Sequence, residues 1–564
     1  MLTPAKLKLV QDIISSSSKE ELIWLNGYLS GLVSSAGEQT ETAAPAKVLV
    51  DKITIAYGSE TGNSKKLATD FASKAKKSGI NAKLVSLEQY RLTDLPKEKY
   101  FFTVISTQGE GEPPGSAKKF YDHIHQNDTK LSQLKFGVLA LGDTSYPLFC
   151  KAGEDVDTQL SRLGGERIVP LQKCDTDYEE DAQSWFTALM QKLQRPDGAP
   201  QPEAQVVVKK STGKKLYIGS VLSNIDLNDI GSGKQTHHIE IAAEDLEYQP
   251  GDSIGIIPHN PPAIVEAIIA ITGANPDKIL TFRNEEHTLL DLLKSKLNIV
   301  FLPERVVNAY ARIVQQQIPQ TKIGLLDLLK IYPVKDADQF EEAIGILEPI
   351  TPRLYSIASS LEAHSGEVHL TVARDNFVIN GEKKYGLCSD MLCHLPVNAE
   401  LSFYVHKNTQ FRLPAPEKDV IMIGPGTGIA PFRAFLSERD ATGAEGRNWL
   451  FFGDQHFITD FLYQTEIQNW VETETLTHVS LAFSRDQQEK VYVQHKMLKQ
   501  GAELFQWIDQ GGYIYVCGAK DPMSVDVEKT LLLIIKQHGG KDSKGAEAYL
   551  DMLKEEGRYL KDVY

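Results

Sequence analysis

Three stretches rich in glycine and hydroxyl side chains follow strand-like apolar segments in the first third of the chain. They are Gly58–Ser64 (GSETGNS), Ser106–Pro114 (STQGEGEPP) and Leu141–Cys150 (LGDTSYPLFC). Free amides and hydroxyls at such turns bind phosphate oxygens, and the first stretch also opens a helical pattern. Because it lacks the lysine of nucleoside triphosphate loops, a monophosphate without magnesium is favoured. Any one stretch could be ordinary turn chemistry, but three at consecutive strand ends predict a ligand site.

A second group of candidate phosphate ligands lies in the C-terminal third. Ile421–Arg433 (IMIGPGTGIAPFR) is typical of a strand, a glycine turn and a helix, with GxGxG spacing in place of the GxGxxG fingerprint. Ser484, Arg485 and Lys490–Gln494 (KVYVQ) follow the strand-like segment Leu476–Phe483. An arginine, a lysine and hydroxyls at one strand end suit a dianionic phosphate on ribose. This favours NADPH over NADH; the alternative is a solvated basic loop.

Between these two regions lies Arg353–Ser360 (RLYSIASS). An arginine, a tyrosine and several serines in an apolar strand are weak signals alone. A guanidinium fork matches phosphate oxygens, and a tyrosine ring can stack on a flat ligand. The stretch is therefore interpreted as the centre of a cofactor site between the two phosphate-binding regions.

The elements that must position the first group alternate between strands and helices from Ile53 to about Leu193. The expected strands are Ile53–Tyr57, Lys83–Ser86, Phe101–Ser106, Phe136–Ala140 and Glu166–Leu171. Such alternation predicts a doubly wound parallel sheet with helices on both faces. Ligands of these sheets bind beyond the carboxyl ends of the strands, where the three stretches lie.

A proline-rich stretch, Arg195–Pro202, marks a boundary, and the pattern after it changes. The strand-like segments Leu216–Ser223, His238–Ala242 and Asp252–Ile257 suggest a small antiparallel barrel that resumes at Arg353. Helical patterns between about Asn260 and Gln339 predict an inserted helical module, in which no catalytic constellation is evident. Its expected helices are Ala263–Thr272, Leu289–Lys296, Val306–Gln317 and Lys322–Leu329.

Length and charge restrict the class of protein. A chain of 564 residues exceeds one hydrophobic core, and its net charge of −15 argues against general nucleic-acid or anionic-membrane binding. No apolar run approaches a membrane span, and no secretory signal is evident. The five cysteines form no CxxC pair, so a disulfide scaffold, a zinc ribbon and an iron–sulfur cluster are poorly supported. A reducing cytoplasm fits best.

Two further segments suggest contacts with partners. Leu22, Leu25, Leu29 and Leu32 form an amphipathic stripe, followed by the flexible-looking segment Gly37–Pro45. A docking helix for subunit association is favoured over a helix that caps the next domain. The acidic run Cys174–Asp181 is expected to complement a helix start; a docking patch for an electron acceptor is the alternative.

The first half resembles the flavodoxin-like, flavin mononucleotide (FMN)-binding domain of the diflavin reductase family. The resemblance implies that the FMN phosphate is held by Ser59, Glu60, Thr61, Gly62, Asn63 and Ser64. It implies that the isoalloxazine is flanked by Ser106, Thr107, Gln108 and Gly109 and covered by Leu141, Gly142, Asp143, Tyr146, Phe149 and Cys150. Many diflavin reductases carry tyrosine where Gln108 stands, so Tyr146 is expected to contribute more of the stacking.

The second half resembles ferredoxin–NADP reductases, with an antiparallel barrel for flavin adenine dinucleotide (FAD) and an α/β NADPH domain. The implied FAD residues are Arg353, Leu354, Tyr355, Ser356, Thr371, Val372, Ala373, Gly386, Leu387, Cys388 and Ser389. The implied NADPH residues are Gly426, Thr427, Ser484, Arg485, Lys490, Val491, Tyr492, Val493, Gln494 and Asp526. Tyr564 would cover the FAD ring and move for the nicotinamide. Ser356, Cys517 and Asp562 would form the polar surround of hydride transfer, and Cys388 is expected to be an inert buried thiol.

Within the diflavin reductases the chain resembles the flavoprotein subunits of assimilatory NADPH–sulfite reductases, through its N-terminal helix and its C-terminal Asp-Val-Tyr. This implies electron transfer from NADPH to FAD, to FMN and then to a sirohaem/iron–sulfur beta subunit that reduces sulfite. The alternatives are a soluble NADPH–haemoprotein (cytochrome) reductase and a non-catalytic flavodoxin-like redox scaffold.

The FMN domain is expected to move about the Arg195–Pro202 linker. The expected segments are association 1–36, linker 37–51, FMN domain 52–194, linker 195–206, FAD barrel 207–414 with a helical insert at about 260–340, and NADPH domain 415–564.

Overall fold

The structure is a computed structural model. It describes residue 50 and residues 52–59, 62–109, 111–127, 129–143, 148–175, 178–194, 215–282, 285–319, 322–379 and 382–564. The predicted N-terminal helix, the Arg195–Pro202 linker, Glu60, Thr61 and Tyr146 lie outside these residues. Contacts divide the chain into two units, Met1–Thr144 with Leu148–Gln205 and Ser145–Pro147 with Val206–Tyr564.

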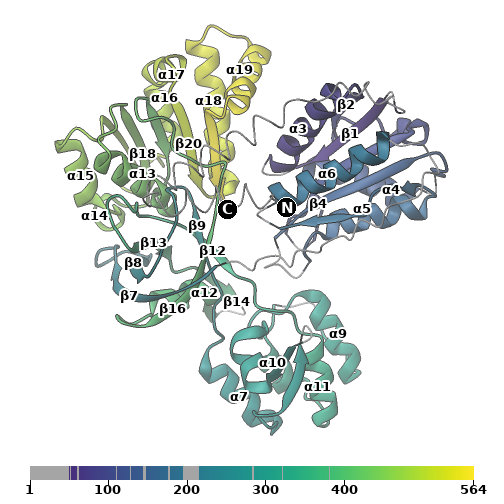
Figure 1. Cartoon of the computed structure of the whole chain (residues 1–564). Coiled ribbons are helices and arrows are strands. Elements are labelled where there is room, and N and C mark those ends of the chain that lie inside the picture. Colours follow the sequence, from purple (N-terminus) through teal and green to yellow (C-terminus); the bar gives the residue numbers. More distant parts are fainter. Residues whose placement is uncertain are drawn as a thin grey trace, which may run out of the picture. The chain divides into compact units, whose positions relative to one another are not determined.

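The first unit is a parallel sheet between two layers of helices (Figure 1). Its strands are β1 (Lys52–Gly58), β2 (Asn81–Ser86), β3 (Tyr100–Ser106), β4 (Lys135–Leu141) and β5 (Glu166–Arg167), in the order β2-β1-β3-β4-β5. One face packs on α3 (Asn63–Lys77) and α6 (Glu179–Gln194), and the other on α4 (Lys118–Gln126) and α5 (Lys151–Arg162). This is the flavodoxin-like order, as predicted.

The last predicted strand of this sheet is broken. In place of one strand over Glu166–Leu171, the chain forms β5 and then β6 (Gln172–Cys174), and both pair with β4. Pro170 lies between them, and a proline has no amide hydrogen to donate to a strand ladder. The break leaves Cys174 beside Leu141, at the edge where the predicted ligand loops begin.

The second unit begins with an antiparallel sheet. Its strands are β7 (Leu216–Asp226), β8 (Thr236–Ala243), β9 (Ser253–Ile256), β12 (Arg353–Ser356), β13 (Glu367–Ala373) and β16 (Glu400–His406), in the order β12-β9-β16-β7-β8-β13. In the described part of the chain the single bridge between Ile357 and Leu370 joins the two edge strands. The sheet therefore curls as the barrel pattern predicted, but no full ladder closes it. The hairpin β14 (Asn376–Ile379) and β15 (Glu382–Tyr385) and the helix α12 (Leu387–Cys393) lie beside it in sequence.

A helical module with its own core interrupts this sheet between β9 and β12. It contains α7 (Pro262–Thr272), α8 (Leu289–Asp291), η3 (Leu292–Lys296), α9 (Glu304–Val314), α10 (Leu325–Ile331) and α11 (Ala337–Gly345). The sequence patterns indicated the helices up to α10 but missed α11 and the hairpin of β10 (Ile279–Phe282) and β11 (Glu285–Thr288). Each of these strands has only four residues and none is fully buried, so their hydrophobic pattern is too short to detect.

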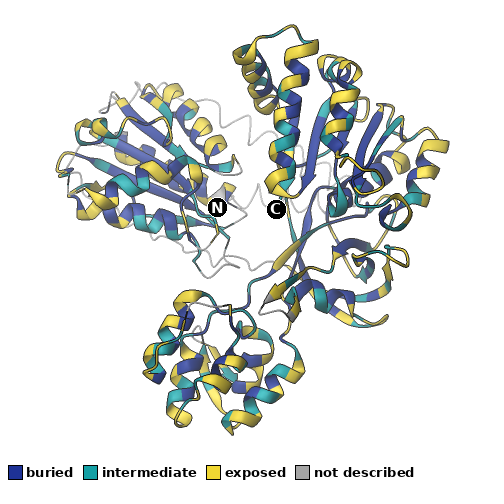
Figure 2. Ribbon diagram, turned by 180° about the vertical axis from the view of Figure 1, so that it is seen from behind, coloured by how far each residue is buried: buried dark blue, intermediate teal, exposed yellow. Residues whose placement is uncertain are grey.

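The chain ends in a second parallel sheet, in the order β19-β18-β17-β20-β21. Its strands are β17 (Val420–Ile423), β18 (Asn448–Asp454), β19 (His478–Phe483), β20 (Tyr513–Gly518) and β21 (Tyr559–Val563). One face packs on α13 (Ala430–Ala441) and α15 (Gln464–Glu472), and the other on α16 (Val493–Lys499), α17 (Gly501–Asp509), α18 (Val525–His538) and α19 (Ser543–Glu555). Figure 2 shows the strands as a buried layer between helices with exposed outer faces. No described helix has the length and apolar character of a membrane span.

Candidate functional site

The first ligand loop follows β1, at the point where the order of the parallel strands reverses. Ligands of such sheets bind at this switch point between β1 and β3. Gly62 has a φ of 95° and donates its amide hydrogen to Ser59 Oγ at 2.9 Å. The turn places Asn63 at the first position of α3, where backbone amides are free to bind an anion.

Side chains at this switch point have hydrogen-bonding capacity left over. Asn63 Oδ1, Ser64 Oγ and Ser106 Oγ are buried without a hydrogen-bond partner among the described residues. Buried polar groups are almost always satisfied, so three such atoms at two adjacent strand ends fit a bound polar ligand. The hydroxyls of Ser64 and Ser106 can donate to phosphate or flavin oxygens, and the chemistry of this donor set therefore fits FMN.

The other two loops are held by their own hydrogen bonds. Thr107 Oγ1 accepts from the amide of Ala152 at 3.2 Å, and Gln108 Nε2 donates to the carbonyl of Pro113 at 3.2 Å. The Gln108 side chain thus braces its own loop, which turns at Gly109 with a φ of 51°. Leu141 ends β4, and Gly142, Asp143 and Phe149 lie in the loop after it. Burial raises the pKa of Cys150 to about 12, so its thiol stays protonated.

On the antiparallel sheet, β12 presents the predicted FAD residues in order. Arg353 and Leu354 are exposed, and the Tyr355 side chain lies close to the Cys388 thiol. Burial and the neighbouring Cys388 raise the pKa of Tyr355 above its usual range, and burial raises the pKa of Cys388 to about 11. Both groups are therefore neutral at physiological pH, which agrees with the inert thiol expected for Cys388.

The remaining predicted FAD residues lie on β13 and at the start of α12. Thr371 Oγ1 hydrogen-bonds the Tyr463 hydroxyl at 2.6 Å, and Val372 is buried. Ala373 ends β13. The predicted pyrophosphate turn does open a helix, since Gly386 precedes Leu387, the first residue of α12. Ser389 Oγ donates to the Gly386 carbonyl at 3.2 Å and accepts from the Asp375 amide at 3.1 Å.

The glycine turn after β17 lies at the switch point of the second parallel sheet, between β17 and β20. Gly426 has a φ of 59°, and a Cβ there would have Asp454 Oδ2, at 3.9 Å, as its only neighbour within 4 Å. A Cβ on Gly428 would lie 2.2 Å from the Cys517 carbonyl oxygen. Gly428 therefore lets the turn pack directly on β20, while the face at Gly426 stays open. A face of bare backbone before a helix fits the pyrophosphate of NADPH.

Ser356, Cys517 and Asp562 are brought together beside this turn. Cys517 on β20 and Asp562 on β21 are register partners, and Ser356 Oγ donates to Asp562 Oδ2 at 3.0 Å. Burial raises the pKa of Asp562, an effect that its hydrogen bond from Ser356 and the nearby His406 oppose. Burial raises the pKa of Cys517 well above its usual value. The cluster thus offers a hydroxyl, a thiol and a carboxyl group.

The last residue lies on the glycine turn. The Tyr564 hydroxyl hydrogen-bonds Thr427 Oγ1 at 2.7 Å. Its amide donates to the Gly518 carbonyl at 3.1 Å, and its carbonyl accepts from the Lys520 amide at 2.9 Å. The residue as a whole is 64% exposed. The backbone of Tyr564 thus extends β21, while its side chain makes a hydrogen bond to the glycine turn.

The predicted phosphate cluster lies where β19 ends. Ser484 is buried, and its amide donates to the Asp454 carbonyl at 2.9 Å. Arg485, Lys490 and Tyr492 are exposed, which suits binding of a ligand phosphate. Val491 and Val493 instead pack in the core of the sheet, and Gln494 is half-buried on α16. Asp526 lies in the first turn of α18 and pairs with Lys529 at 3.8 Å.

Sequence reasoning missed Asp454, which ends β18 beside the glycine turn. Its Oδ1 accepts from Lys234 Nζ at 2.6 Å, while Oδ2 is buried without a partner in the described part of the chain. Burial raises the pKa of Asp454, and Lys234 opposes that rise. A carboxylate at the end of an apolar strand (FFGD) was the available signal, but its lysine partner lies far away in sequence.

Replacing Gly428 by alanine tests the close packing of the glycine turn. The new methyl group would lie 2.2 Å from the Cys517 carbonyl oxygen, so the turn must shift. We expect a loss of about 1–3 kcal/mol in the free energy of unfolding, measured by urea titration of the purified chain. The control is Gly345→Ala, where no neighbouring atom lies within 4 Å of the new Cβ, and it should cost nothing. A fully stable Gly428→Ala would contradict the packing.

Replacing Asp562 by asparagine tests the protonation of the reaction cluster. Because the pKa of Asp562 is raised on folding, its carboxyl group favours the folded state below the unfolded pKa of about 3.9. That contribution is lost as the pH rises through the raised pKa. Asp562→Asn should therefore raise the midpoint of thermal unfolding at pH 7 by about 1–3 °C, and less at pH 4. An equal gain at both pH values in calorimetry would contradict this.

Comparison with protein-family models finds three matches along the chain. A flavodoxin model matches residues 55–185, an FAD binding domain model matches residues 209–314 and 301–391, and an oxidoreductase NAD-binding domain model matches residues 422–529. The order agrees with the two parallel sheets and the antiparallel sheet between them. The chain therefore combines an FMN-type flavodoxin domain with FAD and nicotinamide-dinucleotide domains.

Curated relatives match over the whole chain. The sulfite reductase [NADPH] flavoprotein alpha-component of Bacillus subtilis (strain 168) is 40% identical, with 99% of this chain and 98% of the relative covered. Proteins with the same description are 38% identical in Cronobacter sakazakii and 37% identical in Escherichia coli O157:H7, each covering 100% of this chain and 98% of the relative. The chain belongs to the family of NADPH–sulfite reductase flavoprotein alpha-components.

Proposed function

We propose that this chain passes electrons from NADPH to FAD, then to FMN, and then to a sirohaem/iron–sulfur beta subunit that reduces sulfite to sulfide. The observation that carries the proposal is the junction of Ser356, Cys517 and Asp562 beside the glycine turn. It brings a strand of the antiparallel sheet to the switch point of the dinucleotide sheet. When bound, NADPH supplies a hydride, FAD accepts both electrons, and FMN passes electrons singly.

The residues of the junction would hold FAD and NADPH beside one another. Tyr355 offers a neutral ring beside Ser356, and Thr427 and the open face at Gly426 offer donors to the nucleotide. Tyr564 would have to leave its contact with Thr427 for the nicotinamide of NADPH to bind there. With NADPH bound, Ser356 and Asp562 would be placed to stabilise the charge that develops during hydride transfer. The contribution of these residues would be chiefly positioning of the two cofactors.

The remaining assignments divide by cofactor. We assign the ribose phosphate of NADPH to Ser484, Arg485, Lys490, Tyr492 and Gln494, with Asp526 as a further contact. The FAD pyrophosphate is assigned to Arg353 and to the turn at Gly386–Ser389. The FMN phosphate is assigned to the turn Ser59–Ser64, and its ring to the loops after β3 and β4. The unpaired Ser64 and Ser106 hydroxyls support that last assignment.

Assembly and location belong to the same proposal. We assign residues 1–36 to association between copies, 52–194 to the FMN domain, 207–414 to the FAD domain and 415–564 to the NADPH domain. The amphipathic leucine stripe of residues 22–32 supports the first assignment. All five cysteines are buried and free, which suits a reducing cytoplasm.

The proposed acceptor is tested with the purified full-length chain, NADPH and sulfite. We expect sulfide to form only when a sirohaem-containing protein is added, because the proposal places the metal centre that reduces sulfite in the beta subunit. The control mixture contains a cytochrome haemoprotein in place of the sirohaem protein. Sulfide formed without the sirohaem protein, or electrons passed only to the cytochrome, would overturn the assignment.

The choice of NADPH is tested by removing the two exposed cations after β19. Arg485→Ala combined with Lys490→Ala removes two charge-assisted hydrogen bonds, each worth about 1.5–3 kcal/mol. We expect KM for NADPH to rise about 100-fold or more, while the activity with NADH changes little. Lys499→Ala, an exposed lysine at the end of α16, is the matched control. An equal loss with both nucleotides would argue for a structural role.

A further inference from the structure

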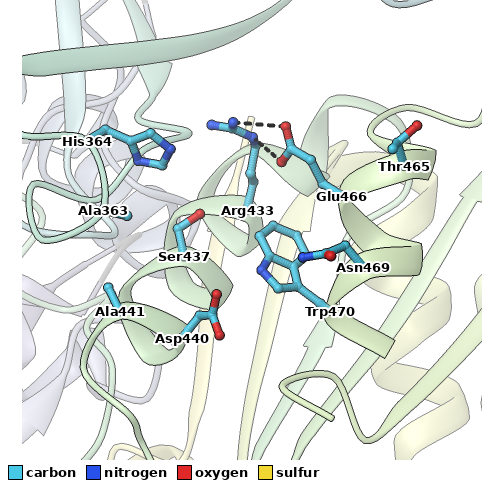
Figure 3. A pocket seen from close by; sticks show the side chains of 10 residues that line it. All are labelled: Ala363, His364, Arg433, Ser437, Asp440, Ala441, Thr465, Glu466, Asn469 and Trp470. Atoms are coloured by element: carbon cyan, nitrogen blue, oxygen red, sulfur yellow. Dashed lines mark hydrogen bonds and ion pairs between the residues drawn. The ribbon is translucent and has the colours of Figure 1, made fainter. Parts of the chain in front are cut away.

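A buried cation that has no assigned role joins the antiparallel sheet to the dinucleotide sheet. Arg433 on α13 is only 6% exposed. Its Nε and Nη2 donate to the two carboxylate oxygens of Glu466 on α15, at 2.7 and 3.0 Å. Its Nη1 donates across to the Ala358 carbonyl at 2.7 Å and to His369 Nδ1 at 3.0 Å. Figure 3 shows the paired side chains of Arg433 and Glu466.

The hydrogen atoms in this cluster can be assigned by chemistry. A guanidinium only donates, so His369 Nδ1 accepts, and its Nε2 carries the proton and donates to Glu367 at 2.8 Å. In the same way His238 Nε2 donates to Glu240 at 3.2 Å, and its Nδ1 accepts from the Tyr463 hydroxyl at 3.0 Å. Burial and Arg433 lower the pKa of His369 to about 2 and that of His238 to about 4. Both imidazoles are therefore neutral at physiological pH.

This assignment argues against a metal site. Ligand atoms of His238, Glu240 and His369 lie within 4.8 Å of one another, a spacing at which a cation could bind. A histidine binds a metal through an unprotonated ring nitrogen. Both Nε2 atoms carry protons here, and the other nitrogen of His369 already accepts from a guanidinium. The cluster is instead a set of acceptors that holds one cation in place.

Arg433 holds two parts of the reaction site at once. It lies one turn into α13, and α13 directly follows the glycine turn Gly426–Ile429. Its acceptor Ala358 lies two residues after Ser356, and the Ala358 amide donates to the His369 carbonyl at 2.8 Å. A second contact repeats the link further along α13, where Ser360 Oγ donates to Glu438. The helix that carries the nucleotide turn is thus fixed to the segment that carries Ser356.

Water reaches only one side of the cation. Glu466 is 38% exposed and lines a cavity of about 490 Å³ with His364, Ser437 and Trp470 (Figure 3). On the opposite side, Ala358 is completely buried and His369 is 2% exposed. Hydrogen bonds in such dry surroundings have well-defined geometry and are costly to leave unmade. The buried side, with Ala358, is the one that continues along the chain to Ser356.

We propose that Arg433 is a positioning residue for hydride transfer, setting the separation between the nucleotide turn at Gly426 and Ser356. This rests on the proposed NADPH oxidation by a bound FAD. A displacement of 1 Å between reacting groups can slow a reaction by a factor of about 100. A lysine at 433 would keep the positive charge but could not reproduce the planar fork.

The test compares two buried arginines of the same helix. Arg433→Lys should slow the reduction of FAD by NADPH in single-turnover stopped flow by about 10- to 100-fold. The dissociation constant of NADP+ should stay within about twofold, because the proposed ribose phosphate site is elsewhere. Replacing the transferred hydrogen of NADPH by deuterium should give a larger isotope effect than in the unchanged chain. These three readouts separate positioning from simple loss of folded protein.

Arg439→Lys is the matched control. Arg439 is 3% exposed and donates to the carbonyls of Lys418 at 3.0 Å and Gly446 at 2.7 Å. Both acceptors lie close to β17 and β18, away from the antiparallel sheet. This variant should lose thermal stability but reduce FAD at the unchanged rate. Equal slowing by both variants, or normal FAD reduction in Arg433→Lys, would overturn the proposal.

A milder variant keeps the test decisive if Arg433→Lys folds poorly. Ser360→Ala removes the hydroxyl that contacts Glu438 and should slow FAD reduction by about two- to fivefold, also without a change in NADP+ binding. An unchanged rate in that variant would count against the proposal. A chain without substitutions that fails to reduce FAD with NADPH would refute the proposed function itself, before any variant is compared.

Discussion

The hydrogen bond from Ser356 to Asp562 is the contact on which the proposed reaction site depends. It joins β12 of the antiparallel sheet to β21, the last strand of the dinucleotide sheet. Neither sheet contains the whole reaction cluster by itself. Cofactor chemistry needs two ring systems at contact distance, so the chain must fix one sheet against the other. The buried Arg433 joins them a second time, through the Ala358 carbonyl.

The two parallel sheets form their nucleotide-binding turns at equivalent positions. Each has a point where the strand order reverses, β1 against β3 and β17 against β20, and each has a glycine turn and a helix start there. Parallel topology forces these loops to one edge of the sheet, whatever their distance in sequence. At Gly62 and Gly426 a positive φ exposes the backbone amides. Two copies of this design on one chain suit two different nucleotide cofactors.

Features governed by local pattern could be predicted from the sequence. The strand ends and the glycine turns follow from hydrophobic periodicity and spacing, and the structure places Ser356, Cys517 and Asp562 together. Pairs of distant residues could not be predicted: Lys234 and Asp454 are 220 positions apart, and nothing local marks Arg433 as a junction. At Pro170 a single residue interrupts the strand that the apolar pattern of Glu166–Leu171 predicted. The hydrogen bond from the Gln108 side chain to the Pro113 carbonyl depends on a side-chain rotamer, which the spacing of residues in the sequence does not predict.

The most direct test of this account is a double-mutant cycle across the junction. Ser356→Ala, Asp562→Ala and the combined variant would be compared in the rate at which NADPH reduces FAD within one turnover. If the two side chains act as one unit, the combined variant should be slowed no more than the slower single variant. Single effects that multiply in the combined variant would show that Ser356 and Asp562 act independently, and would contradict a reaction site assembled at the junction of the two sheets.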